Sequence, residues 1–65
     1  MKYFQERIVE EKSEIDIKIV ELAGFIYSDK FVTIEKEQQD LLERQLYAMM
    51  VHSNCLKDRI TNLYY

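Results

Sequence analysis

The second half of the chain has the spacing of a long amphipathic helix. Apolar or small residues recur there at intervals of alternately four and three. The series is Leu42, Leu46, Met49, Ser53, Leu56, Ile60 and Leu63. A 4-3 repeat sustained over about three heptads places these side chains on one helical face, as in a coiled coil. The pattern predicts a helix from about residue 34 to about residue 63.

An apolar stripe at helical spacing also runs through the first half. It consists of Ile8, Ile15, Ile19, Leu22, Phe25 and Ile26. Its period predicts a helix from about residue 5 to about residue 27. Proline is absent and Gly24 is the only glycine, so little in the sequence interrupts either helix.

Residues 28–33 separate the two stripes. Because this connection is short, the two helices are expected to be antiparallel neighbours. We expect Thr33 to cap the second helix, and Phe31 and Ile34 to close the open end of the hairpin. The sequence therefore predicts an all-α fold, an antiparallel hairpin of two long amphipathic helices that forms one domain over residues 1–65.

Each predicted helix has a second apolar flank outside the seam of the hairpin. This flank consists of Val9, Val20, Tyr27, Tyr47, Met50, Tyr64 and Tyr65. A single hairpin would leave more apolar surface exposed than a monomer normally shows. With one cysteine, Cys55, the chain cannot form an internal disulfide to supplement its small core. We therefore expect several copies to assemble into a homo-oligomeric helical bundle.

The charges and the apolar runs of the chain indicate which partners and which location to expect. Nine basic and 12 acidic residues give a net charge of -3. Binding to polymeric DNA or RNA depends on neutralising phosphates with Lys and Arg, so we expect neither as a partner. No uncharged stretch is long enough to span a bilayer, and the start lacks the apolar run of a signal peptide. We expect a cytoplasmic protein with no membrane partner.

No pattern typical of catalysis occurs in the sequence. It contains no Gly-rich phosphate loop and no Ser-centred nucleophile motif. His52 and Cys55 share a helix face, but a zinc site normally needs four ligands. We interpret these two residues as a polar pair in a helix interface. We expect no metal, no other cofactor and no enzymatic activity.

Three side chains are suited to an anionic, aromatic ligand. Lys18 lies beside the apolar stripe of the first helix, Arg59 flanks the seam of the second, and Tyr3 precedes the first helix. The residue pattern alone favours ordinary roles for them. Lys18 would pair with Glu14 at i,i-4, and Tyr3 would pack on the bundle. Arg59 would pair with neighbours of Cys55 or with Asp58 of another copy.

Two stretches of the chain carry a family resemblance. They are residues 22–31, LAGFIYSDKF, and residues 37–49, EQQDLLERQLYAM, and the closing Arg59 and Ile60 also fit it. On these stretches the chain resembles a family of short phage and prophage proteins. That family is similar to the phage anti-CBASS sponges. Those sponges are helical homohexamers that sequester cyclic di- and trinucleotides made by bacterial defence synthetases.

The resemblance implies a bacteriophage immune-evasion protein that acts in the host bacterial cytoplasm. It would capture cyclic di- or trinucleotides between the protomers of a homohexamer, without catalysis. The resemblance assigns base stacking to Tyr3, a phosphate contact to Lys18, and the cyclic trinucleotide site to Arg59. Two alternatives stay open beside it. One is a phage helical module that binds and inhibits a host protein, and the other is a structural bundle without a ligand.

Overall fold

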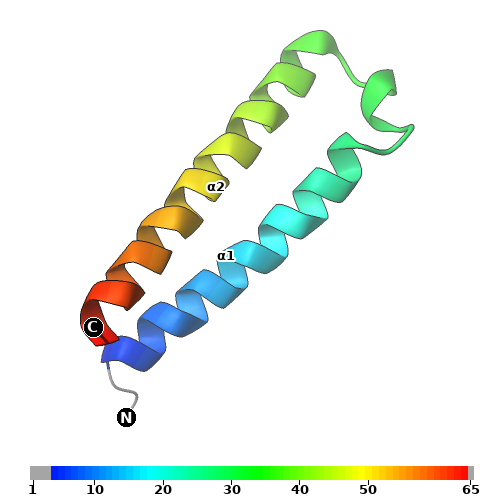
Figure 1. Cartoon of the computed structure of the whole chain (residues 1–65). Helices are drawn as coiled ribbons and strands as arrows, with labels where there is room; N and C mark the ends of the chain where they lie inside the picture. Colours follow the sequence, from blue (N-terminus) through cyan, green and yellow to red (C-terminus); the bar gives the residue numbers. More distant parts are fainter. Residues whose placement is uncertain (1–3, 65) are drawn as a thin grey trace.

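The chain forms a hairpin of two long helices (Figure 1). A computed structural model describes residues 4–64, and the side chains of residues 5–63. Helix α1 spans Phe4–Ile26, the short 3₁₀ helix η1 spans Phe31–Thr33, and α2 spans Lys36–Tyr64. The long helices lie antiparallel and side by side, with η1 at one end of the molecule. The all-helical antiparallel hairpin predicted from the sequence is confirmed.

The core of the hairpin is the seam between α1 and α2. Ile8 and Leu56 are buried there, and Leu56 is only 1% exposed. Most of the other seam side chains are partly buried. They are Ile15, Ile19, Leu22, Ile26, Leu42, Leu46, Met49 and Ile60. One hairpin therefore encloses few side chains completely, as expected for a two-helix chain of this length.

A hydrogen bond crosses the seam at its buried polar position. Ser53 is 8% exposed, and its Oγ donates a hydrogen bond of 2.5 Å to Oδ1 of Asp16 on α1. Asp16 also forms an ion pair of 2.7 Å with Nζ of Lys12. A buried hydroxyl is tolerated in an apolar seam when its hydrogen bond is satisfied. The contact joins the two helices and helps to fix their register.

A second polar contact crosses the hairpin at the other edge of the seam. Nε2 of His52 lies 3.3 Å from Oε2 of Glu11. Glu11 and Asp16 are five residues apart, which turns their side chains about 140° from each other around α1. The Glu11–His52 and Asp16–Ser53 contacts therefore define two different faces of the hairpin.

The pKa of Asp16 leads to a prediction about acid stability. Hydrogen bonds from Lys12 and then from Ser53 hold this pKa below its ordinary value of 3.8. The charged carboxylate therefore stabilises the fold fully above its ordinary pKa, and that contribution is lost as the pH falls through the lower, folded value. We expect Asp16→Asn to be less stable than the unsubstituted chain at neutral pH, with the difference narrowing in acid. Denaturant midpoints at several pH values measure this, and a difference that stays constant into acid would contradict it.

The predicted cap of the second helix is wrong. Thr33 lies in η1, where its Oγ1 donates a hydrogen bond of 2.6 Å to the carbonyl of Lys30. Helix α2 begins at Lys36, and the carbonyl of Glu35 accepts the hydrogen bond from the backbone N–H of Gln39 at 3.0 Å. Glu35 thus precedes the first turn, because the chain makes a turn of 3₁₀ helix before α2 can start.

The loop is closed by contacts to both helices. Phe31 is buried, and its ring meets that of Phe25 edge to face, with centroids 6.2 Å apart. Nε2 of Gln39 donates hydrogen bonds to the carbonyls of Phe31 and Ile34, at 3.1 and 2.9 Å. The expectation that Phe31 closes this end of the hairpin is confirmed.

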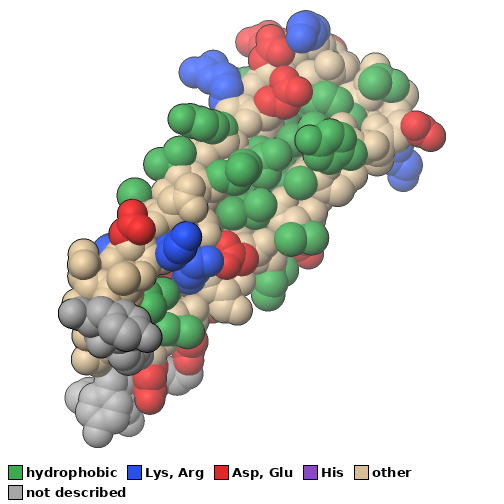
Figure 2. Space-filling model, viewed as in Figure 1, with side chains coloured by type: hydrophobic (Ala, Val, Ile, Leu, Met, Phe, Trp, Pro, Cys, Tyr) green, Lys and Arg blue, Asp and Glu red, His purple; other side chains and the backbone are tan. Residues whose placement is uncertain are grey.

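The second apolar flank is exposed in the hairpin. Val20 is 71% exposed and Tyr27 is 87% exposed, and Val9, Tyr47 and Met50 are exposed as well. Hydrophobic side chains gather over both helices in the half of the molecule nearest η1 (Figure 2). The side chain of Tyr64 and the whole of Tyr65 lie outside the described residues. Assembly with further copies would bury this surface, and it stays a prediction.

Candidate ligand-binding face

Lys18 is an exposed cation on α1 without a partner among the residues that the structure describes. Glu14, the residue expected from the pattern to pair with it, does not do so. Within residues 4–64, no hydrogen bond or ion pair joins Lys18 to another side chain. An isolated i,i+4 pair on a helix surface contributes only a few tenths of a kcal/mol, so its absence costs little. The ammonium group is therefore available to an anion from outside the chain.

Arg59 lies near the end of α2, beside the start of α1. It lines a shallow surface depression of about 250 Å³ together with Ile8, Asn62 and Leu63. The depression combines two apolar side chains with a guanidinium and an amide. A guanidinium can bind a phosphate through two parallel hydrogen bonds, which suits it to a phosphodiester.

Lys18 and Arg59 lie on the same face of the hairpin. Lys18 follows Glu11 by seven residues and Arg59 follows His52 by seven, and Glu11 and His52 meet across the seam. Two helical turns bring a side chain back to nearly the same direction. Both cations therefore project on the side of the Glu11–His52 contact, which we call the Glu11–His52 face.

The two cations do not form a single site within one chain. Because α1 and α2 are antiparallel, seven residues along each helix lead away from the Glu11–His52 contact in opposite directions. Lys18 and Arg59 are therefore separated by roughly 20 Å along the hairpin, at 1.5 Å per residue. A small ligand reaches both only if they come from different copies, and otherwise they belong to two sites. Tyr3, the third predicted site residue, lies outside the described residues.

The contact between Glu11 and His52 depends on the register of the two helices, which the sequence pattern does not specify. His52 shares a helix face with Cys55, and within the hairpin its side chain contacts a carboxylate on the other helix. Cys55 is an exposed free thiol. Among the described residues, no group of three or more His, Cys, Asp or Glu side chains is arranged to hold a metal ion.

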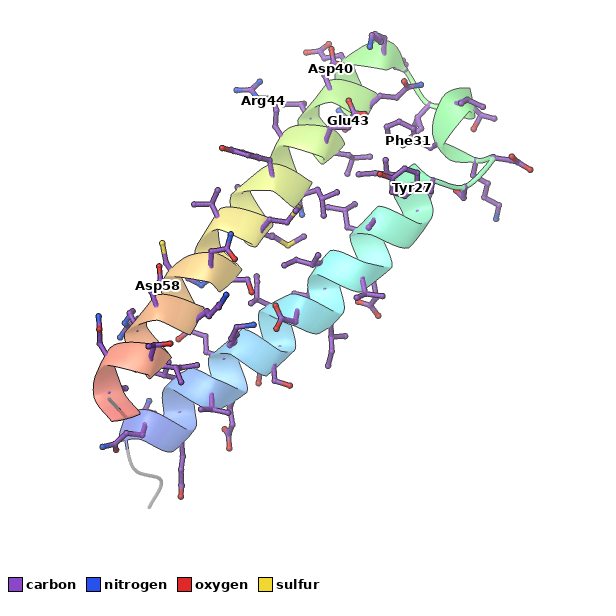
Figure 3. The ribbon with its side chains drawn as sticks, viewed as in Figure 1. Tyr27, Phe31, Asp40, Glu43, Arg44 and Asp58 are labelled. Atoms are coloured by element: carbon purple, nitrogen blue, oxygen red, sulfur yellow. The ribbon has the colours of Figure 1, made fainter. Side chains whose placement is uncertain are left out.

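A wider depression lies on α2 near the loop, and its charge does not suit a phosphate. Asp40, Glu43, Arg44 and Tyr47 line a space of about 650 Å³. Asp40, Glu43 and Arg44 project from the part of α2 nearest the loop (Figure 3). Two carboxylates beside one guanidinium repel an anionic ligand, so Lys18 and Arg59 remain the better candidates despite their shallower surroundings.

Comparison with known proteins places the chain in a family. The family model described as Sequestin matches residues 2–62. The chain belongs to the Sequestin family. A protein of Enterobacteria phage T4, described as "Uncharacterized 7.5 kDa protein in denB-rIIB intergenic region", is 37% identical over 60 residues. The alignment covers 92% of this chain and 94% of the phage protein. No solved structure matches the chain.

The Sequestin match includes α1 and α2 as far as residue 62, with Lys18 on α1 and Arg59 on α2. The family name and the phage relative fit the expected group of small phage proteins similar to the anti-CBASS sponges, so this part of the sequence analysis is confirmed. No helix in the described part of this Sequestin chain has the length and apolar composition needed to cross a membrane.

Proposed function

We propose that this Sequestin is a phage anti-CBASS protein that sequesters cyclic di- or trinucleotides between the protomers of a homo-oligomer. The family name, which denotes sequestration, is the observation on which the proposal mainly depends. Binding one messenger per site lowers its free concentration in the host cytoplasm, so the defence effector is not activated. Capture needs no reacting group, and the protein acts as a binding protein rather than an enzyme.

The candidate residues match the chemistry of such a ligand. A cyclic dinucleotide offers phosphodiester charges and two aromatic bases. The ammonium of Lys18, which no other described residue pairs with, contacts a phosphate, and the ring of Tyr3 stacks on a base. The guanidinium of Arg59 binds phosphate at a separate site, the one that takes a cyclic trinucleotide. The separation of the two cations along the hairpin supports two sites rather than one.

The shape of a single hairpin supports a site between protomers. Small-ligand sites bury most of the ligand and usually enclose about 300–1,000 Å³. The depression at Arg59 is smaller than this, and Lys18 lies on an open helix surface. Walls for a nucleotide must then come from further copies. The exposed apolar flank with Val20 and Tyr27 gives those copies a surface on which to pack, and a homohexamer is the assembly we propose.

Recovery of the bound ligand tests capture against turnover. The protein is mixed with each of a panel of cyclic di- and trinucleotides, separated from free ligand by gel filtration, and denatured by heat. We expect one nucleotide to be retained in a fixed ratio to protein and to be released chemically intact. Release of a linear or otherwise cleaved product would contradict the proposal, and so would failure of the assembled protein to retain any nucleotide.

A further inference from the structure

The side of α2 turned away from α1 has a heptad repeat of its own. Seven residues there are spaced alternately by three and four. They are Leu41, Arg44, Ala48, Val51, Cys55, Asp58 and Asn62. All are exposed in the hairpin, and Arg44 and Asp58 project from this side of the helix (Figure 3). We call this surface the outer α2 face. A sustained 3-4 repeat is the spacing at which one helix packs along another.

The charges of the outer α2 face are arranged symmetrically about its centre. Arg44 lies seven residues before Val51, and Asp58 lies seven residues after it. Neither has a hydrogen bond or ion pair with another residue among those described. Between them lie the small or uncharged side chains of Ala48, Val51 and Cys55. Such a centre lets a second helix approach closely.

We propose that the outer α2 face binds the same face of a second copy, antiparallel and about a two-fold axis at Val51. In a parallel pair Arg44 would lie beside Arg44 and Asp58 beside Asp58, which is unfavourable. The antiparallel pair places Arg44 of each copy opposite Asp58 of the other, so the interface contains two Arg44–Asp58 ion pairs. Such an isologous contact needs only one self-complementary surface. The occupant of this face is therefore another copy of the chain.

This pairing also extends the surface around Arg59. Asn62 belongs to the outer α2 face and lines the depression that contains Arg59. A second copy on this face places the part of its α2 nearest the loop beside that depression, with its Asp40 opposite Asn62 in this register. The inference rests on the self-assembly in the proposed function but not on the ligand.

Cysteine cross-linking tests the position of the two-fold axis. Val51→Cys, made with Cys55→Ser, places one thiol beside its copy at the axis. Val32→Cys with Cys55→Ser is the control, because Val32 is a valine in η1, outside both the outer α2 face and the second apolar flank, and is 74% exposed against 44% for Val51. Under mild oxidation we expect at least about tenfold more disulfide dimer from Val51→Cys than from the control. Equal yields would overturn the proposal.

The native cysteine gives a second check of the register. Cys55 lies four residues from Val51, so two copies of Cys55 are offset by roughly 12 Å along the pair. This exceeds the reach of a disulfide, and the unsubstituted chain should not cross-link through Cys55. Ala48→Cys in the native background should cross-link, because residue 48 of each copy lies opposite Cys55 of the other. Cross-linking of the unsubstituted chain with none added by Ala48→Cys would overturn the register.

A charge exchange tests the ion pairs. Arg44→Asp and Asp58→Arg each place like charges together, and each should weaken self-association about tenfold. The double variant Arg44→Asp/Asp58→Arg should restore it, which a role within one chain would not do. If sedimentation shows an oligomer that neither single variant weakens, the outer α2 face is not the interface and the proposed assembly still stands. A monomeric unsubstituted chain would overturn both.

Discussion

Leu56→Ala is expected to lower the free energy of unfolding by about 2–5 kcal/mol. Leu56 is the most deeply buried side chain among the described residues, in a seam with few others that are fully enclosed. The truncation removes apolar contacts and leaves a cavity that two helices cannot easily fill. Small domains of this kind have little stability to spare, so a large part of the population should unfold.

Urea denaturation followed by circular dichroism measures this effect. Protein concentration must be the same for every variant, because the stability of an oligomer depends on it. Leu63→Ala is the control, since Leu63 occupies the same seam but is partly exposed, and its loss should be about 1 kcal/mol. Equal losses in the two variants would show that the seam does not form the core in solution.

Lys18→Glu is expected to weaken cyclic nucleotide binding about 100-fold, with helix content and assembly unchanged. Removing one partner of a charged hydrogen bond at an interface costs about 2–5 kcal/mol, and about 1.4 kcal/mol is a factor of ten in affinity. The substitution also places a carboxylate beside the ligand's phosphate. Because Lys18 has no partner within the described part of the chain, its loss breaks no described contact that holds the hairpin together.

The control for Lys18→Glu is the same substitution at Lys57. Lys57 is also exposed, and no ion pair joins it to another described residue. It follows Ser53 by four residues, so it lies toward the Asp16–Ser53 contact rather than on the Glu11–His52 face. Titration with a fluorescent cyclic nucleotide measures the affinity of each variant. Equal losses of affinity in Lys18→Glu and Lys57→Glu would show that net charge, and not the position of Lys18, decides binding.

The hairpin was predictable because its signal is local. The 4-3 repeat from Leu42 to Leu63 and the matching stripe in the first half specify two helices and their inward faces. Ser53 was visible as a polar member of the repeat. Its partner Asp16 was not, because that contact depends on the register between two helices, which a period alone does not specify.

The missed cap and the contact of His52 have the same physical origin. Thr33 has the chemistry of a cap, but Gln39 of α2 binds the loop carbonyls of Phe31 and Ile34, and a 3₁₀ turn forms instead. His52 has a helix neighbour at Cys55, but its contact is with Glu11 across the hairpin. In both cases a longer-range contact prevailed over the local pattern.

The candidate site was predictable only as a set of residues. The sequence predicts Tyr3, Lys18 and Arg59 as ligand-binding residues. The Glu11–His52 contact places the two cations on one face and well apart. How that face is completed depends on other copies of the chain. Neither helical period nor the fold of one hairpin specifies the arrangement of those copies, and for this reason the hexamer is proposed from the family resemblance.

Thermal stability with and without cyclic nucleotides tests the central claim most directly. The protein's mass in solution is measured in parallel, to show that it is assembled. A ligand that binds only the folded state adds about 2.7 kcal/mol at one hundred times its Kd, which is several degrees for a domain of this size. We expect such a shift with one cyclic di- or trinucleotide, lost in Lys18→Glu and kept in Lys57→Glu. An assembled protein that shows no shift with any member of the panel would contradict sequestration and favour a host protein as the target.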